Sequence, residues 1–413
     1  MAESLRTGGE AEDLAGEVIR LGARRAIQEL LEQEVSEILG RGRYERKGDQ
    51  SGGYRNGYKQ RRLDCAEGRL DVELPQVRGT SQKPQLWQEL KGRTGTLERL
   101  VVEMYARGLS TRDIEDALVG LIQGEDGPLL SRSSVSRVTE VLWEEYEAFC
   151  QRSLASYDVV YLFADAVYET LRRHTGSSEA ILVTWGIQSD GSRVLVHMGL
   201  GNKESHADWL EHFRDLVKRG MKTPLTVTTD GAPGLIKALE AIWPESERIR
   251  CWFHKMGNIL DKVPDQAKDT VKSYLVAVRD APDYDRGTER AREALAMLDR
   301  EYPTAARCLR DDLDASLAHL KLPVAHRRSI RTTNALERSF GEERRRSKVI
   351  PKFRSEKECL KLVFGVLWRA SERWRRVRFS EHERRQLERY LSAKNQAREQ
   401  EDHKDASHRV AGA

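Results

Sequence analysis

The sequence has no long apolar run, few cysteines and almost no excess of charge of one sign. Hydrophobic residues make up 39% of the 413 residues and charged residues 33%, and no apolar stretch approaches the roughly 18 residues that a membrane-spanning helix needs. The cysteines are odd in number and scattered, which excludes a disulfide framework and favours a reducing compartment. No basic segment followed by an apolar core opens the chain, so we expect no secretory signal, no membrane partner and a cytoplasmic location.

Positive charge is concentrated in two segments, although the net charge is only +4. Eight basic residues lie between Arg41 and Arg62, and eight more lie between Arg327 and Lys348. Such clusters favour a polyanionic partner, because phosphate binding depends on local counterion release and not on total charge. Charge alone favours two solvated surface faces.

The chain of 413 residues is too long for one simple core. Changes in composition and periodicity along it predict several domains. The pattern first predicts a helical region at 1–47, a small basic β module at 48–92 and three helices at 93–155. The remaining segments are a strand-and-helix domain at 156–258, an all-helical insertion at 259–324, a return to the first domain at 325–372, and a basic C-terminal helix with a disordered tail at 373–413.

The first half carries side chains suited to nucleic acid. Arg55, Lys59 and Arg61 alternate with tyrosines in the β module and are candidates for phosphate contacts. The third helix begins with Ser-Arg-Ser-Ser, which favours a helix-turn-helix whose residues Ser133, Ser134 and Arg137 reach base edges, with Arg112 of the preceding helix as a further DNA contact. Structural three-helix bundles are common, so a purely structural role stays open.

From residue 157 onward the pattern predicts an α/β domain. Three strands are expected at 159–165, 180–187 and 193–200, followed by a helix from Ser205, a strand at 225–230, a helix at 233–242 and a strand at 248–253. This order is that of the ribonuclease H-like fold, a mixed five-stranded sheet with helices. Its first and fourth strands lie side by side, so Asp165 and Asp230, at the ends of these strands, are expected to converge.

A third acid completes a candidate site for phosphoryl transfer. Two divalent ions bind the attacking and leaving oxygens in such reactions, and hard ions need oxygen ligands. Glu337 opens a helix that runs into a basic segment, and Arg344 lies nearly two turns further on the same helix face. Arg345, Arg346 and Lys348 turn away from that face and suit a DNA backbone. An ordinary surface helix fits the same pattern, and Glu342 or Glu343 is the alternative acid.

Several ordered motifs resemble bacterial insertion-sequence transposases of the Mutator-related family. They include Gly53-Tyr-Arg-Asn-Gly-Tyr58, Gly201-Asn-Lys-Glu-Ser205, Asp230-Gly-Ala-Pro-Gly-Leu235, Cys251-Trp-Phe-His-Lys255 and Thr332-Thr-Asn-Ala-Leu-Glu337. The resemblance implies a catalytic triad of Asp165, Asp230 and Glu337 that holds two Mg²⁺ or Mn²⁺ ions. It also implies an all-helical insertion before the third acid. The implied partners are the terminal inverted repeats of the element and target DNA, bound by a homodimer or a larger assembly.

Cys251 and His254 form a Cys-x-x-His pair, which is one half of a common zinc pattern. Structural zinc needs four ligands, and no second pair with suitable spacing stands nearby, so we expect no zinc. With Asn258, this pair belongs to the resemblance and follows the fifth predicted strand. We expect these residues to pack the site or to orient DNA or a catalytic group.

Two other functions fit parts of the sequence. A DNA-binding protein without catalysis accounts for the helix-turn-helix and the basic segments but not for three acids in this order. A structure-selective nuclease accounts for the acids but not for the N-terminal DNA-binding half. DNA binding, cutting without joining, and strand transfer give different products, so the products formed from DNA distinguish a DNA-binding protein, a nuclease and a transposase.

Overall fold

The computed structural model describes residues 14–45, 52–82, 84–90, 92–119, 128–170, 178–201, 204–333, 340–341, 344, 353 and 355–411. The chain divides into two compact units, an N-terminal unit Met1–Leu142 and a C-terminal unit Trp143–Ala413. The seven-part division of the sequence is finer than these units and stays a prediction.

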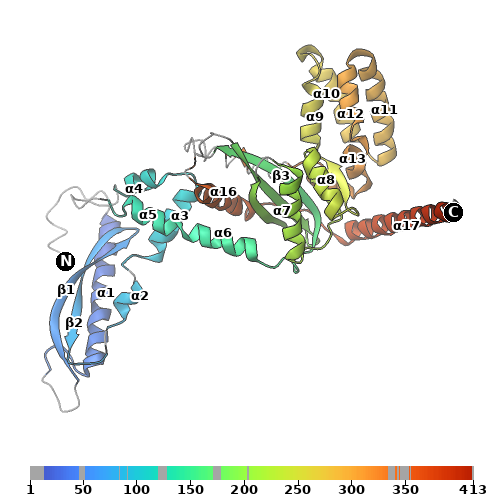
Figure 1. The fold of residues 1–413 in the computed structure, drawn as a ribbon. Helices are drawn as coiled ribbons and strands as arrows, with labels where there is room; N and C mark the ends of the chain where they lie inside the picture. The colour runs from blue at the N-terminus through green and yellow to red at the C-terminus, as the bar shows by residue number, and fades with distance from the viewer. Residues whose placement is uncertain are drawn as a thin grey trace. The chain divides into compact units, whose positions relative to one another are not determined.

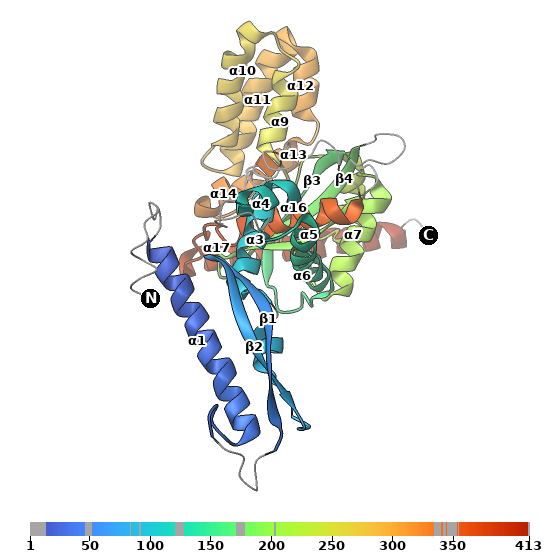
Figure 2. The same ribbon diagram turned by 90° about the vertical axis from the view of Figure 1, so that its left-hand side faces the viewer.

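In the N-terminal unit, a long helix and a hairpin lie side by side (Figure 2). The helix α1 spans Leu14–Leu39, and the antiparallel hairpin consists of β1 (Tyr54–Cys65) and β2 (Gly68–Arg78). The amide of Gln28 binds the backbone of Glu73 in both directions, at 2.8 and 2.9 Å, and fixes the hairpin against α1. The helix ends at Gly40, whose φ of 63° suits glycine. The predicted helix and hairpin are therefore confirmed.

The short helices of the N-terminal unit follow the predicted caps and breaks. After α2 (Leu86–Leu90) come α3 (Gly95–Ala106), α4 (Thr111–Val119) and α5 (Arg132–Thr139), and α6 (Val141–Gln151) begins at the end of the unit. Ser131 caps α5 by accepting a hydrogen bond from the Ser134 amide. The helices α3, α4 and α5 pack on one another, with Ile114, Leu118 and Val135 buried.

A mixed five-stranded sheet forms the centre of the C-terminal unit. Its strands are β3 (Val159–Thr170), β4 (Ser178–Gln188), β5 (Arg193–Gly201), β6 (Thr226–Thr229) and β7 (Glu247–Arg250), in the order β5-β4-β3-β6-β7. The pairs β3–β4 and β4–β5 are antiparallel, whereas β3–β6 and β6–β7 are parallel. The predicted neighbours, the first and fourth strands of this region, are thus confirmed as adjacent.

The two faces of β3 enter different cores because successive side chains point to opposite sides of a sheet. Leu162 and Ala164 pack against α7 (His206–Lys218) and α8 (Pro233–Ile242). Phe163 stacks on Trp185 of β4 with ring centroids 3.8 Å apart on the opposite face. The sheet is therefore covered on both sides, which holds its strands rigidly in place.

A helical bundle is inserted between β7 and the last part of the C-terminal unit (Figure 1). It contains α9 (Trp252–Leu260), α10 (Asp265–Arg279), α11 (Tyr284–Glu301), α12 (Pro303–Arg310), α13 (Leu313–Leu317) and the 3₁₀ turn Ala318–Lys321. Trp252, Leu275 and Leu298 belong to its buried core. The predicted all-helical insertion is confirmed. The chain returns through α14 (Val324–Ile330) and α16 (Glu356–Ser371) and ends in α17 (Glu381–Ala411).

Three predicted boundaries differ from the structure. The strand expected to end at Asp165 continues to Thr170, because its next residues pair with β4 down to Ser178. The strand expected at 248–253 ends at Arg250, since Trp252 begins α9 and is buried in the core of the insertion. The expected disordered tail is helical to Ala411. Residues 381–411 contain no glycine or proline and many strong helix formers.

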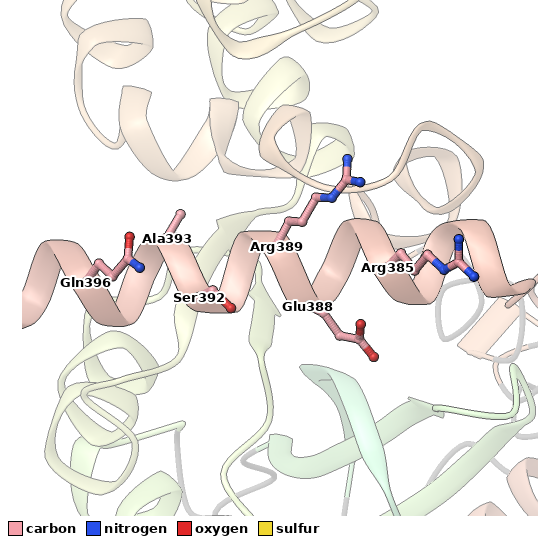
Figure 3. A pocket seen from close by; sticks show the side chains of 6 residues that line it. All are labelled: Arg385, Glu388, Arg389, Ser392, Ala393 and Gln396. Carbon is pink, nitrogen blue, oxygen red and sulfur yellow. The ribbon is translucent and has the colours of Figure 1, made fainter.

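The surface of α17 carries a shallow hollow (Figure 3). It is lined by Arg385, Glu388, Arg389, Ser392, Ala393 and Gln396. All six side chains come from this one helix, and neither candidate aspartate is among them. The hollow is therefore not a candidate catalytic site. Among the described helices, none is both long enough and apolar enough to cross a membrane.

Candidate active site

Asp165 of β3 and Asp230, directly after β6, lie next to each other in the central sheet. Ala164 of β3 pairs with Thr229 of β6 in parallel register, so the next residue on each strand is an aspartate. Neighbouring strands lie about 4.8 Å apart, which brings the two carboxylates within reach of one ion. The backbone register places the two residues side by side, and the charge of Asp230 acts on Asp165.

The surroundings of Asp165 make its negative charge costly. The residue is only 7% exposed, and burial, with the nearby charge of Asp230, raises the pKa of its carboxyl to about 7. Its Oδ1 accepts a hydrogen bond of 2.9 Å from the Ala166 amide, and the hydroxyl of Thr333 hydrogen-bonds the same carboxylate. The Asp230 carboxylate accepts a 2.9 Å bond from the Ala232 amide. A divalent cation bound by the carboxylates of Asp165 and Asp230 would offset the repulsion between their negative charges. These oxygen donors therefore fit a hard metal ion.

Arg250 provides a buried positive charge behind Asp230. Its side chain is 5% exposed, and burial lowers its pKa although the charge of Asp230 opposes this. Gly231 has a φ of 89°, and a Cβ at this position would lie 2.4 Å from Cζ of Arg250. Only glycine therefore leaves room for the guanidinium. The Nε and Nη1 groups of Arg250 have no hydrogen-bond acceptor within the described ranges. The guanidinium interacts electrostatically with the carboxylates of Asp230 and Asp312.

Glu204, Tyr168 and His254 surround the two aspartates. Burial, and then the charge of Asp230, raises the pKa of Glu204 to about 6, while the hydroxyl of Tyr168 donates a hydrogen bond to its carboxylate. The positive form of His254 lies close enough to lower the pKa of both Asp165 and Glu204. Sequence reasoning assigned no role to Glu204 or Tyr168. The available signal was the resemblance, since Glu204 stands in the motif Gly201-Asn-Lys-Glu-Ser205.

Cys251 ties the segment before Glu337 to this edge of the sheet. Its Sγ lies 3.5 Å from Oγ1 of Thr333 and accepts a 3.4 Å hydrogen bond from the Thr333 amide. The Trp252 amide donates a 2.9 Å bond to the carbonyl of Arg331. Glu337 follows Thr333 by four positions, and four residues span at most about 14 Å. Thr333 therefore anchors the chain four positions before Glu337 in the sequence.

Several predicted site residues lie outside the described residues. They are Glu337, its alternatives Glu342 and Glu343, and the cations Arg345, Arg346 and Lys348. Arg344 is described and is helical and exposed. Among the residues that the structure describes, no group of three or more histidines, cysteines, aspartates or glutamates has a metal-binding arrangement. The two aspartates are thus the part of the predicted triad that the structure brings together.

Comparison with known proteins shows the family of this chain. The family model described as "Transposase, Mutator family" matches residues 3–377. This chain belongs to the Mutator family of transposases. It is 31% identical over 352 residues, covering 85% of this chain and 87% of the relative, to the transposase of insertion sequence element ISRM5 from Rhizobium meliloti (strain 1021).

Other relatives of this Mutator-family chain carry the same kind of name. It is 32% identical over 366 residues to the transposase of IS406 from Burkholderia multivorans (strain ATCC 17616 / 249), covering 88% of this chain and 92% of the relative. It is 33% identical over 274 residues to the transposase of IS6120 from Mycolicibacterium smegmatis, covering 66% and 84%. Family membership supports a role in DNA transposition.

The Cys-x-x-His motif of this transposase divides into two parts. Cys251 is buried and holds Thr333, whereas His254 is partly buried and faces the acids. The His254 Nδ1 atom is buried and has no hydrogen-bond partner in the described part of the chain. Asn258 lies one turn further along α9 and is exposed. The motif therefore links the edge of the sheet to the chain that leads to Glu337.

The predicted DNA contacts of the N-terminal unit are mostly exposed. Lys59, Arg61, Arg112, Ser133 and Arg137 are exposed, and Ser134 is half-buried at the start of α5. Arg55 differs from the prediction. Its guanidinium is 2.9 Å from Glu32 and 2.9 Å from Ser36 of α1, so it fastens the hairpin to the helix and is not free to grip phosphate.

Proposed function

We propose that this protein binds the terminal inverted repeats of an insertion sequence and catalyses metal-dependent cleavage and strand transfer at the ends. The adjacent register of Asp165 and Asp230 is the observation that carries the proposal. With Glu337, they form an Asp-Asp-Glu set for two Mg²⁺ or Mn²⁺ ions, which polarise the scissile phosphate when bound. The anchored Thr333, four positions before Glu337 in the sequence, supports this third position.

The residues of the chain have separate tasks in this reaction. Asp165 and Asp230 present oxygens from neighbouring strands, and rigid strands hold them without the reorganisation that mobile loops need. Arg250 places a buried positive charge beside Asp230 and limits the repulsion between the two carboxylates before the ions bind. Arg344 is the candidate cation for the transferred strand, because positioning of the strand in line with its nucleophile governs phosphoryl transfer.

DNA recognition falls to the N-terminal unit in this proposal. The exposed Ser133 and Arg137 at α5 read base edges as the recognition helix of a helix-turn-helix, and exposed Lys59 and Arg61 of β1 contact phosphates. The salt bridge of 2.8 Å between Arg132 and Glu115 fixes α5 against α4. We infer that the chain acts as a homodimer or larger assembly on DNA, since an element has two ends to bring together.

A supercoiled plasmid that carries the element ends tests the proposal. We expect the parent protein with Mg²⁺ or Mn²⁺ to give nicked ends and joined products. Asp165→Asn, Asp230→Asn and Glu337→Gln should each bind the ends normally and give neither product. Glu342→Gln and Glu343→Gln are the matched controls and should keep activity. Binding without cutting by the parent would favour a DNA-binding protein, and cutting without joining would favour a nuclease.

A further inference from the structure

The hydrogen-bonded pair of Tyr168 and Glu204 has no role in the reaction described above. Tyr168 lies three residues beyond Asp165 on β3, about 10 Å along the strand. At this point β6 has already ended, and β3 continues with β4 alone, where Tyr168 pairs with Ala180. This end of the β3–β4 hairpin therefore extends past the two aspartates, and Tyr168 leaves β3 on the face opposite to Asp165, where it lies near Asp230.

Tyr168 is one of the exposed aromatic residues of the C-terminal unit. It is 52% exposed, while its hydroxyl is held by the Glu204 carboxylate. A tyrosine on a strand normally turns its hydroxyl to water and buries its ring. Here the polar end is held by the protein and the apolar ring is exposed, which leaves the ring as the contact surface.

The backbone around Glu204 is built to hold this carboxylate in place. Glu204 has a φ of 51°, a left-handed conformation that non-glycine residues rarely adopt. Its turn joins β5 to α7, and the first turn of α8 packs directly against it. A Cβ on Gly234 would lie 2.8 Å from the carbonyl oxygen of Glu204 and 2.9 Å from the amide of His206. The absence of a side chain at Gly234 thus allows the close approach.

We propose that Tyr168, positioned by Glu204, stacks against the base of a nucleotide next to the scissile phosphate and holds that nucleotide out of the duplex. The inference rests on the proposed function, since it assigns a ligand beside the same two aspartates. Bases of any sequence present a flat face to an aromatic ring, so such a contact needs no sequence code. Asp230 and Glu204 lie near the ring, and their negative charge disfavours a phosphate there but not an uncharged base.

Cleavage of a paired and an unpaired DNA end by the full-length protein tests this role. On a fully paired end, Tyr168→Ala should cut roughly 10- to 100-fold more slowly than the parent, because stacking that favours the unpaired nucleotide is lost. On the same end with mismatches at the cleavage point, the variant should recover to within a few-fold of the parent. Tyr168→Phe and Glu204→Gln keep the ring and should lose less than Tyr168→Ala. Tyr274→Ala, which changes a 38% exposed tyrosine of the insertion, is the matched control.

A binding signal gives a readout that does not depend on cleavage. With a fluorescent adenine analogue at the terminal nucleotide, the parent should change the fluorescence on binding, Tyr168→Phe should largely keep the change, and Tyr168→Ala should lose it. A parent rate for Tyr168→Ala on paired DNA, or an equal loss on paired and mismatched DNA, would overturn the proposal. Complete loss of cleavage in Glu204→Gln alone would also overturn it, because the carboxylate would then act at the reacting phosphate. If the parent binds but does not cut, the proposed function fails, and the fluorescence still decides the stacking.

Discussion

The burial of Asp165 predicts that its ionised carboxylate destabilises the metal-free protein. Its carboxyl is 7% exposed, and its pKa is raised from 3.8 to about 7 by burial and by the charge of Asp230. A difference of about three pH units at roughly 1.4 kcal/mol each gives about 4 kcal/mol as an upper limit. Asp165→Asn removes this charge and keeps an oxygen for the Ala166 amide. The variant should therefore be inactive and yet more stable than the parent.

The expected pH dependence has a definite sign. A folded-state pKa above the unfolded value means that the folded protein binds the proton more tightly between about pH 4 and pH 7. The favourable contribution of the protonated Asp165 is complete below this window and is lost as the pH rises through it. The stability gained by Asp165→Asn should thus be small near pH 5 and largest near pH 8.

Urea unfolding in the presence of a chelator measures this difference. The unfolding free energies of the parent and Asp165→Asn are compared from about pH 5 to pH 8, with Glu211→Gln, an exposed acid of α7, as the control for a change of net charge. Replacing the chelator with Mg²⁺ should stabilise the parent and leave Asp165→Asn nearly unchanged. A variant that is equally or less stable than the parent near pH 8 would refute the reasoning.

Three further predictions concern DNA contacts and the anchor of Glu337. Arg137→Ala should lose roughly 1–3 kcal/mol of discrimination between end and random DNA, whereas Lys59→Ala should weaken both alike and flatten the salt dependence in a binding titration; equal affinity of the parent for both DNAs would contradict this. Arg344→Ala should lower the cleavage rate more than end affinity, and a parent rate would reduce Arg344 to a solvated charge. Cys251→Ala should cost roughly 1 kcal/mol of unfolding free energy and slow cleavage by loosening Thr333. An unchanged cleavage rate would contradict this role of Cys251.

Local chemistry made most of the elements predictable. Ser205 caps α7 through a reciprocal pair with Asp208, and such caps depend on residues only three positions apart. The adjacency of Asp165 and Asp230 was predictable because the order of strands and helices restricts the sheet to few topologies. The length of β3 was not, since its extension depends on pairing with β4 and not on its own residues.

The rest of the site depends on contacts between distant segments. Arg250 was one basic residue among many in the sequence. Its position beside Asp230 depends on the space that Gly231 leaves by having no side chain. Glu204 bonds to Tyr168 although the two are far apart in the sequence, and the first turn of α8 packs against the backbone of Glu204. Arg55 was assigned to phosphate from local charge, but its partner Glu32 lies 23 positions earlier on α1. Periodicity and composition do not contain such pairings.

A change of ligand atom at Asp230 tests most directly whether the aspartates hold the metal ions of strand cleavage. Asp230→Cys replaces an oxygen ligand by sulfur, which Mg²⁺ binds poorly and Mn²⁺ accepts more readily. On a DNA end that the parent cuts with either ion, Asp230→Cys is predicted to be inactive with Mg²⁺ and to recover measurable cleavage with Mn²⁺. Asp158→Cys, at an exposed position before β3, should cut with both ions. Cleavage by Asp230→Cys with Mg²⁺ at the parent rate would contradict a metal-binding role for Asp230.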